Sequence, residues 1–365
     1  MKKALCITLV YAIVMTMLVF APFTANAGEK DAASTGATSG TTGDCTWSLD
    51  ENGVLTISGN GKMHDYSSPW RNNNTIREVR IEKGVTSIGD QAFCDYTAIT
   101  KVTIPDSVTS IGSSSFYGCT NLTNISIPDS VTSIGDLAFS DCKGLTNAII
   151  GNAVLSIGSC AFFNCSNLTS ITIPDSVTII GDSSFSGCNS LTNITIGNSV
   201  TSIGFSAFSS CVGLTSIIFP ESIESIGNFA FSHCTGLTDV TLSDSVIGIG
   251  NSSFYNCPNL KNITIPDSVT IINNRAFGYY KNSIELKVKD FTIYGYTGTE
   301  AQRYANDNNF KFVALDDPAD PTSTTKRDVF GDIDGDGEVT IVDTTFLQRF
   351  AVGLPTPYPI GEPVK

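Results

Sequence analysis

The chain has 365 residues and a formal net charge of −14, with 41% hydrophobic and only 15% charged residues. This acidic balance argues against nucleic-acid binding, because phosphate backbones are bound by basic patches. The length would ordinarily indicate two or three domains, although a solenoid can grow beyond the size of one compact core.

The N-terminus has the features of a secretory signal. Two lysines at positions 2–3 precede an apolar run over residues 4–21, and the small-residue site Ala25-Asn26-Ala27 follows. The pattern predicts a signal peptide over residues 1–27, cleaved after Ala27, and thus a secreted protein with no membrane insertion after cleavage. The alternative is an uncleaved membrane anchor, because the apolar run is close to the length that spans a bilayer.

The segment after the signal predicts a linker and then a cap. Residues 28–43, like residues 316–327, are rich in Thr, Ser, Ala, Asp and Pro, which is typical of flexible linkers. Residues 45–57 alternate apolar and polar side chains around an Asn-Gly pair, as in a β-hairpin. We expect this hairpin to belong to an N-terminal cap over residues 44–84.

Nine phenylalanines then recur at intervals of 23 residues. They are Phe93, Phe116, Phe139, Phe162, Phe185, Phe208, Phe231, Phe254 and Phe277. A fixed period of this length indicates stacked repeats that share one continuous core. The sequence therefore predicts a β-rich solenoid of about nine units over residues 85–290.

Each unit contains a short strand and a turn. Leu168, Ile171 and Ile173 have the L-x-x-L-x-L spacing of a leucine-rich repeat. Both isoleucines should face inward and Thr172 outward, because successive strand residues point to opposite sides. The Pro-Asp-Ser sequence at residues 174–176 ends the strand, and we expect its aspartate to hydrogen-bond within its own turn.

Two positions beside each phenylalanine accept only small residues. The preceding residue is Ala or Ser, and a glycine stands four residues before, from Gly89 through Gly250. Glycine is required either where backbones approach closely or where φ is positive, and the sequence does not distinguish these reasons.

Eleven cysteines would suggest disulfide bonds in a secreted protein. Seven of them, however, follow a repeat phenylalanine by three residues: Cys119, Cys142, Cys165, Cys188, Cys211, Cys234 and Cys257. In stacked turns they would lie about 4.7–4.9 Å apart with parallel side chains, whereas disulfide Cβ atoms converge to about 3.8 Å. We expect buried free thiols, and a row of ligands disfavours a tetrahedral metal site.

The outward strand positions predict a polar, nearly uncharged ribbon across the stacked strands. Asn and Thr side chains offer both donors and acceptors, which suits a glycan or a protein partner. The candidate ligand residues are Asn124, Thr172, Asn193, Thr195, Asp239, Thr241, Asn262 and Thr264. They could equally be ordinary solvent-facing strand residues. An ice-binding ribbon is disfavoured by the interruptions at Ile149 and Ile218.

After the repeats, residues 299–309 predict one short helix with Ala301, Tyr304 and Ala305 on one face. Residues 310–315 predict a final strand. We expect helix and strand to form a C-terminal cap within residues 291–315.

The repeat unit resembles the leucine-rich repeats of the BspA-like family of bacterial surface proteins. The consensus V-T-S-I-G-x-x-A-F-x-x-C-x-x-L-T-x-I-T-I-P-D-S, the hairpin around Trp47 and the Gly-Tyr-Thr-Gly stretch at residues 295–298 carry this resemblance over about residues 44–315. It implies an adhesin or binding module at the bacterial cell surface, with an unspecified protein or glycan partner.

A calcium-binding loop is predicted within residues 328–365. Asp332, Asp334, Asp336 and Asp343 occupy loop positions 1, 3, 5 and 12, and Glu338 would offer its backbone carbonyl. Calcium takes about six to eight oxygen ligands, and this spacing can wrap them around one ion. The alternative is an acidic, solvated turn.

The loop leads into a single amphipathic helix, and the two together resemble one dockerin type I-like repeat. The resemblance implies attachment to the cohesin domain of a scaffold protein through Ile341, Val342, Gln348 and Arg349. Dockerins usually contain two such repeats, whereas this chain shows one.

These features favour a non-catalytic binding or adhesion protein attached to a scaffold by a calcium-dependent tail. Catalysis finds little support, because His64 and His233 lie in different segments and no serine has a nucleophile-elbow context. The alternative is a cellulosome-associated component that degrades polysaccharide, since most dockerin-bearing proteins do so. Protease inhibition and passive spacing stay open.

Overall fold

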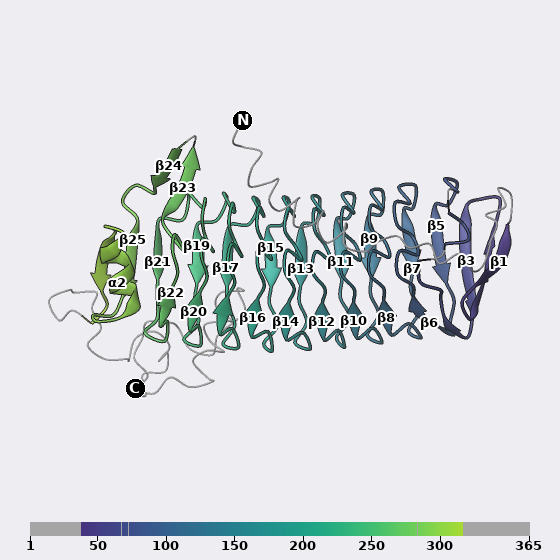
Figure 1. Cartoon of the computed structure of the whole chain (residues 1–365), viewed down its shortest axis with the longest axis horizontal. Coiled ribbons are helices and arrows are strands. Elements are labelled where there is room, and N and C mark those ends of the chain that lie inside the picture. The colour runs from purple at the N-terminus through teal and green to yellow at the C-terminus, as the bar shows by residue number, and fades with distance from the viewer. Residues whose placement is uncertain (1–37, 67, 72, 283, 317–365) are drawn as a thin grey trace, which may run out of the picture. The chain divides into compact units, whose positions relative to one another are not determined.

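The computed structural model describes residues 38–66, 68–71, 73–282 and 284–316. Over these ranges the chain forms a β-solenoid, in which most turns contribute one strand to each of two faces (Figure 1). The predicted signal peptide, the calcium loop and the cohesin-contact residues lie outside the described residues.

One face is a parallel sheet of ten strands. From β6 to β22, paired residues are 23 positions apart, as Ile134 and Ile157 are in β10 and β12. The strands are β4 (Gly61–Lys62), β6 (Val85–Ile88), β8 (Ser110–Ile111), β10 (Ser133–Ile134), β12 (Ser156–Ile157), β14 (Ile179–Ile180), β16 (Ser202–Ile203), β18 (Ser225–Ile226), β20 (Gly248–Ile249) and β22 (Ile271–Ile272).

The second face consists of short strands that also stack in parallel. In β7 to β21 the central residue points inward and its two neighbours are exposed. The strands are β5 (Glu78–Ile81), β7 (Lys101–Thr103), β9 (Asn124–Ser126), β11 (Asn147–Ile149), β13 (Ser170–Thr172), β15 (Asn193–Thr195), β17 (Ser216–Ile218), β19 (Asp239–Thr241), β21 (Asn262–Thr264), β25 (Thr292–Gly295) and β26 (Lys311–Ala314).

The N-terminal segment begins its strands earlier than composition suggests. β1 (Ser39–Thr42), β2 (Cys45–Leu49) and β3 (Val54–Gly59) pair antiparallel, so residues 39–42 form a strand where a linker is predicted. Composition misleads here, because β1 is held by backbone pairing to β2 after the turn at Gly43. The parallel stacking also starts before residue 85, since β3 pairs with β5.

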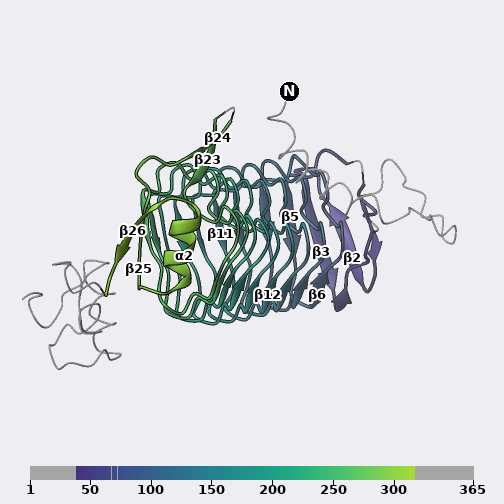
Figure 2. The same ribbon diagram turned by 60° about the vertical axis from the view of Figure 1, so that its left-hand side comes forward.

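The C-terminal segment interrupts the repeat. β23 (Tyr279–Asn282) and β24 (Ile284–Lys287) form an antiparallel hairpin inside the range predicted as solenoid. Figures 1 and 2 show this hairpin projecting from the stacked turns. α2 (Glu300–Asp307) and the parallel strands β25 and β26 follow.

A ladder of aromatic rings fills the interior. All nine repeat phenylalanines are at most 1% exposed, and the neighbouring rings stack with centroids 4.9–5.3 Å apart. Trp70 and Trp47 extend the ladder, because Trp70 stacks on Phe93 at 5.5 Å and meets Trp47 edge-on at 5.7 Å. At the other end Tyr304 meets Phe277 edge-on at 6.3 Å.

The seven repeat cysteines are buried and free, as predicted. Each thiol also donates a hydrogen bond of 3.1–3.3 Å to the carbonyl of the phenylalanine 26 residues earlier. Cysteine therefore fills space and satisfies a buried backbone acceptor at the same time.

Close approach explains the repeat glycines. None of them has a positive φ, but a Cβ on Gly135 would lie 2.6 Å from the backbone nitrogen of Ser113 in the preceding turn.

The aspartates of the Pro-Asp-Ser turns accept hydrogen bonds from the following turn. Asp129 Oδ1 accepts the backbone N–H of Asn152 at 2.7 Å, and Asp175 does the same for Asn198, so the expectation of bonding within their own turn is wrong.

Candidate binding surface

The candidate ligand residues lie together on the second face. All eight are exposed. We call the surface that contains them the polar ribbon, which consists of one column at Asn124, Asn147, Ser170, Asn193, Ser216, Asp239 and Asn262 and a second at Thr103, Ser126, Ile149, Thr172, Thr195, Ile218, Thr241 and Thr264.

The columns follow the register of the paired strands. Asn147 is paired with both Asn124 and Ser170, and Thr172 with Thr195. The face is not one continuous sheet. Strand β7, the four strands β9, β11, β13 and β15, the pair β17 and β19, and strand β21 belong to four separate sheets. The strands nonetheless follow one another along the face across these breaks, as β13, β15, β17 and β19 do in Figure 1.

Hydrogen bonds orient part of the polar ribbon. Asn124 Nδ2 donates to Thr123 Oγ1 at 3.0 Å, and Asn193 Nδ2 donates to Thr192 Oγ1 at 3.1 Å. Both residues are exposed, and neither amide makes a further hydrogen bond among the described residues, which leaves a carbonyl oxygen and an N–H available. The polar side chains of the column follow one another at the spacing of one strand, about 4.7–4.9 Å, and the two oriented amides lie three turns apart.

A shallow groove of about 520 Å³ borders the ribbon at the ends of β7, β9 and β11. Its lining includes Thr103, Ser126 and Ile149 of the ribbon, together with Asp106, Asp129 and Asn152 of the segments that follow the strands. Ile149 is 56% exposed, so the interruption in the threonine column gives this groove an apolar wall. The sequence shows the substitution at Ile149, but the concavity depends on how neighbouring turns pack.

The two histidines occupy unrelated places. His233 is partly buried, its Nδ1 lies 2.9 Å from Asn256 Nδ2, and burial lowers its pKa. His64 lies in a turn far from His233, and its Nδ1 contacts the carbonyl oxygen of the adjacent Asp65.

Among the described residues, no group of three or more His, Cys, Asp or Glu side chains is arranged to hold a metal ion. The same part of the chain has no helix with the length and hydropathy of a membrane span.

Comparisons with known proteins agree with this architecture. A model of the BspA type leucine-rich repeat region matches residues 67–177 and 155–285. A solved leucine-rich repeat protein from Bacteroides ovatus is 26% identical with a TM-score of 0.52, covering 74% of this chain. The chain spans about 65% of the length of that protein.

A leucine-rich cell surface protein from Faecalibacterium prausnitzii is 25% identical with a TM-score of 0.41. The match covers 76% of this chain and 95% of that protein. No curated protein matches. Because the family model matches more than half of the residues of this chain, the chain belongs to the BspA-type leucine-rich repeat family.

Proposed function

We propose that this protein is a secreted or surface-associated, non-catalytic binding protein whose polar ribbon recognises a protein or glycan partner. The observation that supports it most is the alignment of exposed polar side chains over successive strands, among which Asn124 and Asn193 are oriented by hydrogen bonds. Membership of a family of repeat proteins agrees with a binding role.

The ribbon is tested by blocking it without disturbing the core. Thr172→Glu places a charge on the exposed ribbon, whereas Thr178→Glu places one on an exposed position of the same turn beside the ten-stranded sheet. Screening the purified full-length chain on glycan and host-protein arrays should give a partner that only the first variant loses. Equal loss in both variants would contradict recognition by the ribbon.

The tail is proposed as the attachment device. In this proposal Asp332, Asp334, Asp336, Glu338 and Asp343 bind calcium, and Ile341, Val342, Gln348 and Arg349 contact a cohesin domain. Calorimetric titration of the full-length chain should show calcium binding that Asp332→Ala together with Asp336→Ala abolishes. Gln348→Ala with Arg349→Ala should keep calcium binding but weaken cohesin binding. No calcium heat in the unsubstituted chain would exclude the tail mechanism.

We also propose that the two ends act as caps. The antiparallel strands β1 and β2 lie at one end of the parallel stack, and α2 contacts the last aromatic ring at the other. Terminal repeats need such covers, because an open end exposes core residues and unpaired strand edges.

The enzymatic alternative makes a different prediction. A polysaccharide-degrading component should release reducing ends from cellulose or xylan. Measurable turnover by the purified protein would contradict the non-catalytic proposal.

A further inference from the structure

One pair of exposed aromatic residues departs from the repeat pattern. The residue after the repeat glycine, or after its Asn273 equivalent, is polar in eight turns: Asp90, Ser113, Asp136, Ser159, Asp182, Asn228, Asn251 and Asn274. In the turn of β16 this residue is Phe205, and in the next turn Phe229 occupies the following position. The two rings lie 5.6 Å apart at 64°, and both are partly exposed.

The backbone at Phe229 makes this departure unfavourable. Phe229 has φ 58°, the left-handed conformation that this position shares with Ser206 and Ser252 in the neighbouring turns. Bulky residues rarely adopt this conformation, although the repeat imposes it at this position in every turn, Leu137 and Arg275 included. Neither core packing nor backbone preference accounts for an aromatic side chain here.

Polar groups flank the pair in the same column. Asp182, one turn before Phe205, accepts its backbone N–H through Oδ1 at 2.7 Å. Asn228, one turn after, accepts the backbone N–H of Asn251 through Oδ1 at 2.7 Å. These bonds fix both side chains and leave Asp182 Oδ2 and Asn228 Nδ2 without a partner among the described residues.

The charge around the pair is low. From residue 183 to residue 220 the chain contains no charged side chain, and Asp182 is the one carboxylate of the column in a turn adjacent to that of Phe205. A partner here therefore meets two aromatic rings, one free carboxylate oxygen and one free amide.

We propose that Phe205, Phe229, Asp182 and Asn228 form a carbohydrate subsite for a neutral pyranose, separate from the polar ribbon. A pyranose presents an apolar C–H face that packs on an aromatic ring, and hydroxyls that donate to a carboxylate and accept from an amide. An apolar side chain of a protein partner would leave both polar groups unused. A cationic partner could use Asp182 and the ring faces, but it would leave the amide donor of Asn228 unused.

The test uses the full-length chain and three neutral probes, cellohexaose, xylohexaose and mannohexaose, in calorimetric titrations at up to millimolar sugar. At least one probe should bind, and Phe205→Ser or Phe229→Ser should weaken that binding at least tenfold. Leu137→Ser is the matched control, because Leu137 occupies the left-handed position of Phe229 in another turn and should leave binding unchanged.

Phe229→Gly separates binding from folding. Glycine adopts a positive φ freely, so the thermal midpoint of this variant should equal or exceed that of the unsubstituted chain while sugar binding is lost. Thr172→Glu on the ribbon should leave sugar binding intact, so failure of this subsite and failure of the ribbon proposal are distinguishable. Absence of binding to all three probes, or binding that survives Phe205→Ser, would overturn the subsite.

Discussion

At the scale of single residues, each repeat position meets a requirement set by the adjacent turns. A thiol is needed where a phenylalanine carbonyl is buried, and glycine is needed where two backbones meet. The residue before each phenylalanine is buried and small, but its chemistry varies. Ser115, Ser184 and Ser253 place buried hydroxyls there without a hydrogen-bond partner in the described structure.

Ser184→Ala should therefore stabilise the protein. Alanine occupies the same position in other turns, and removing an unpaired buried hydroxyl should raise the free energy of unfolding by about 1 kcal/mol. Urea unfolding followed by circular dichroism measures the change. Ala207→Ser is the converse control and should lower the midpoint. A lower midpoint for Ser184→Ala would show that this hydroxyl is paired.

The buried thiols predict sensitivity to alkali. Burial raises the pKa of Cys188 and Cys234 to about 12, from an ordinary value of 9.0. Above pH 9 the unfolded chain loses these protons while the folded chain keeps them, so their contribution to stability is complete below pH 9 and declines between pH 9 and 12. The decline is about 1.4 kcal/mol per pH unit for each thiol.

Urea midpoints at pH 8, 9 and 10 test this effect. Replacing Cys188 and Cys234 by alanine should flatten the dependence above pH 9, because the tyrosines and remaining thiols are common to both proteins. An unchanged slope would mean that these two thiols do not stay protonated in the folded chain.

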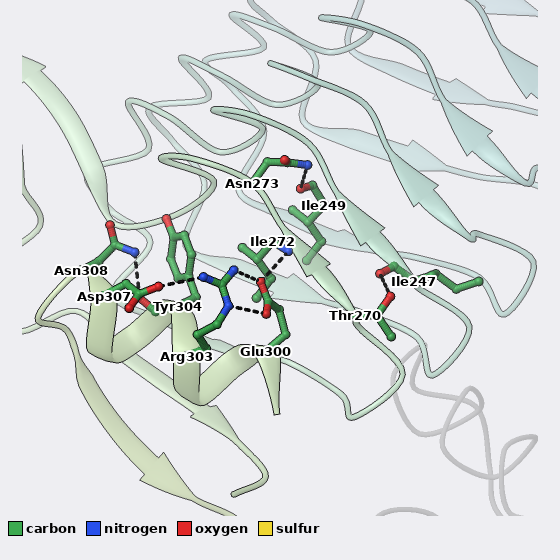
Figure 3. Close-up of polar contacts among 10 residues, drawn as sticks. All are labelled: Ile247, Ile249, Thr270, Ile272, Asn273, Glu300, Arg303, Tyr304, Asp307 and Asn308. Atoms are coloured by element: carbon green, nitrogen blue, oxygen red, sulfur yellow. Dashed lines mark hydrogen bonds and ion pairs between the residues drawn. The ribbon is translucent and has the colours of Figure 1, made fainter. Parts of the chain in front are cut away.

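At the scale of elements, α2 supplies the last repeat turn with hydrogen-bond partners. Each interior turn receives such partners from the turn that follows it. In the interior, the backbone N–H of Phe254 donates to the carbonyl of Ala276 in the following turn. At Phe277 the hydroxyl of Tyr304 accepts the N–H at 3.0 Å and donates to the carbonyl at 2.9 Å. Glu300, paired with Arg303, accepts the N–H of Ile272 in β22 (Figure 3).

Tyr304→Phe keeps the ring but removes both bonds to Phe277. The variant leaves a buried N–H and a buried carbonyl unpaired, so the free energy of unfolding should fall by about 1–3 kcal/mol. Hydrogen exchange should accelerate first at Phe277. Tyr280→Phe is the control, because Tyr280 is partly exposed. Equal effects in the two variants would argue against a role of the hydroxyl at this end.

At the scale of the whole molecule, the described residues contain a continuous core from Trp47 to Tyr304. Deleting residues 317–365 should therefore leave the melting temperature of the solenoid unchanged while removing calcium binding. Deleting residues 291–365 also removes α2, β25 and β26 and should lower the melting temperature. Differential scanning calorimetry with and without calcium compares the three proteins. Destabilisation by the shorter deletion would show that the tail supports the solenoid.

The sequence by itself determined the stacked architecture, the buried phenylalanines and the free cysteines. A fixed period states which residues lie one above another, and an unbroken column of apolar residues at that period can only be the core. The same period, with tryptophan admitted in place of phenylalanine, would also have placed Trp70 and Trp47 in the ladder.

Only the tertiary structure decided the strand at residues 39–42, the hairpin at residues 279–287, the turn-to-turn bonds of Asp129 and Asp175 and the groove beside Ile149. The aromatic pair at Phe205 and Phe229 belongs with them, since neither residue follows the period of the core. These features depend on the distance and orientation between segments of adjacent turns. Residue identity gives the order of the turns, but their separation follows from how the side chains between them pack.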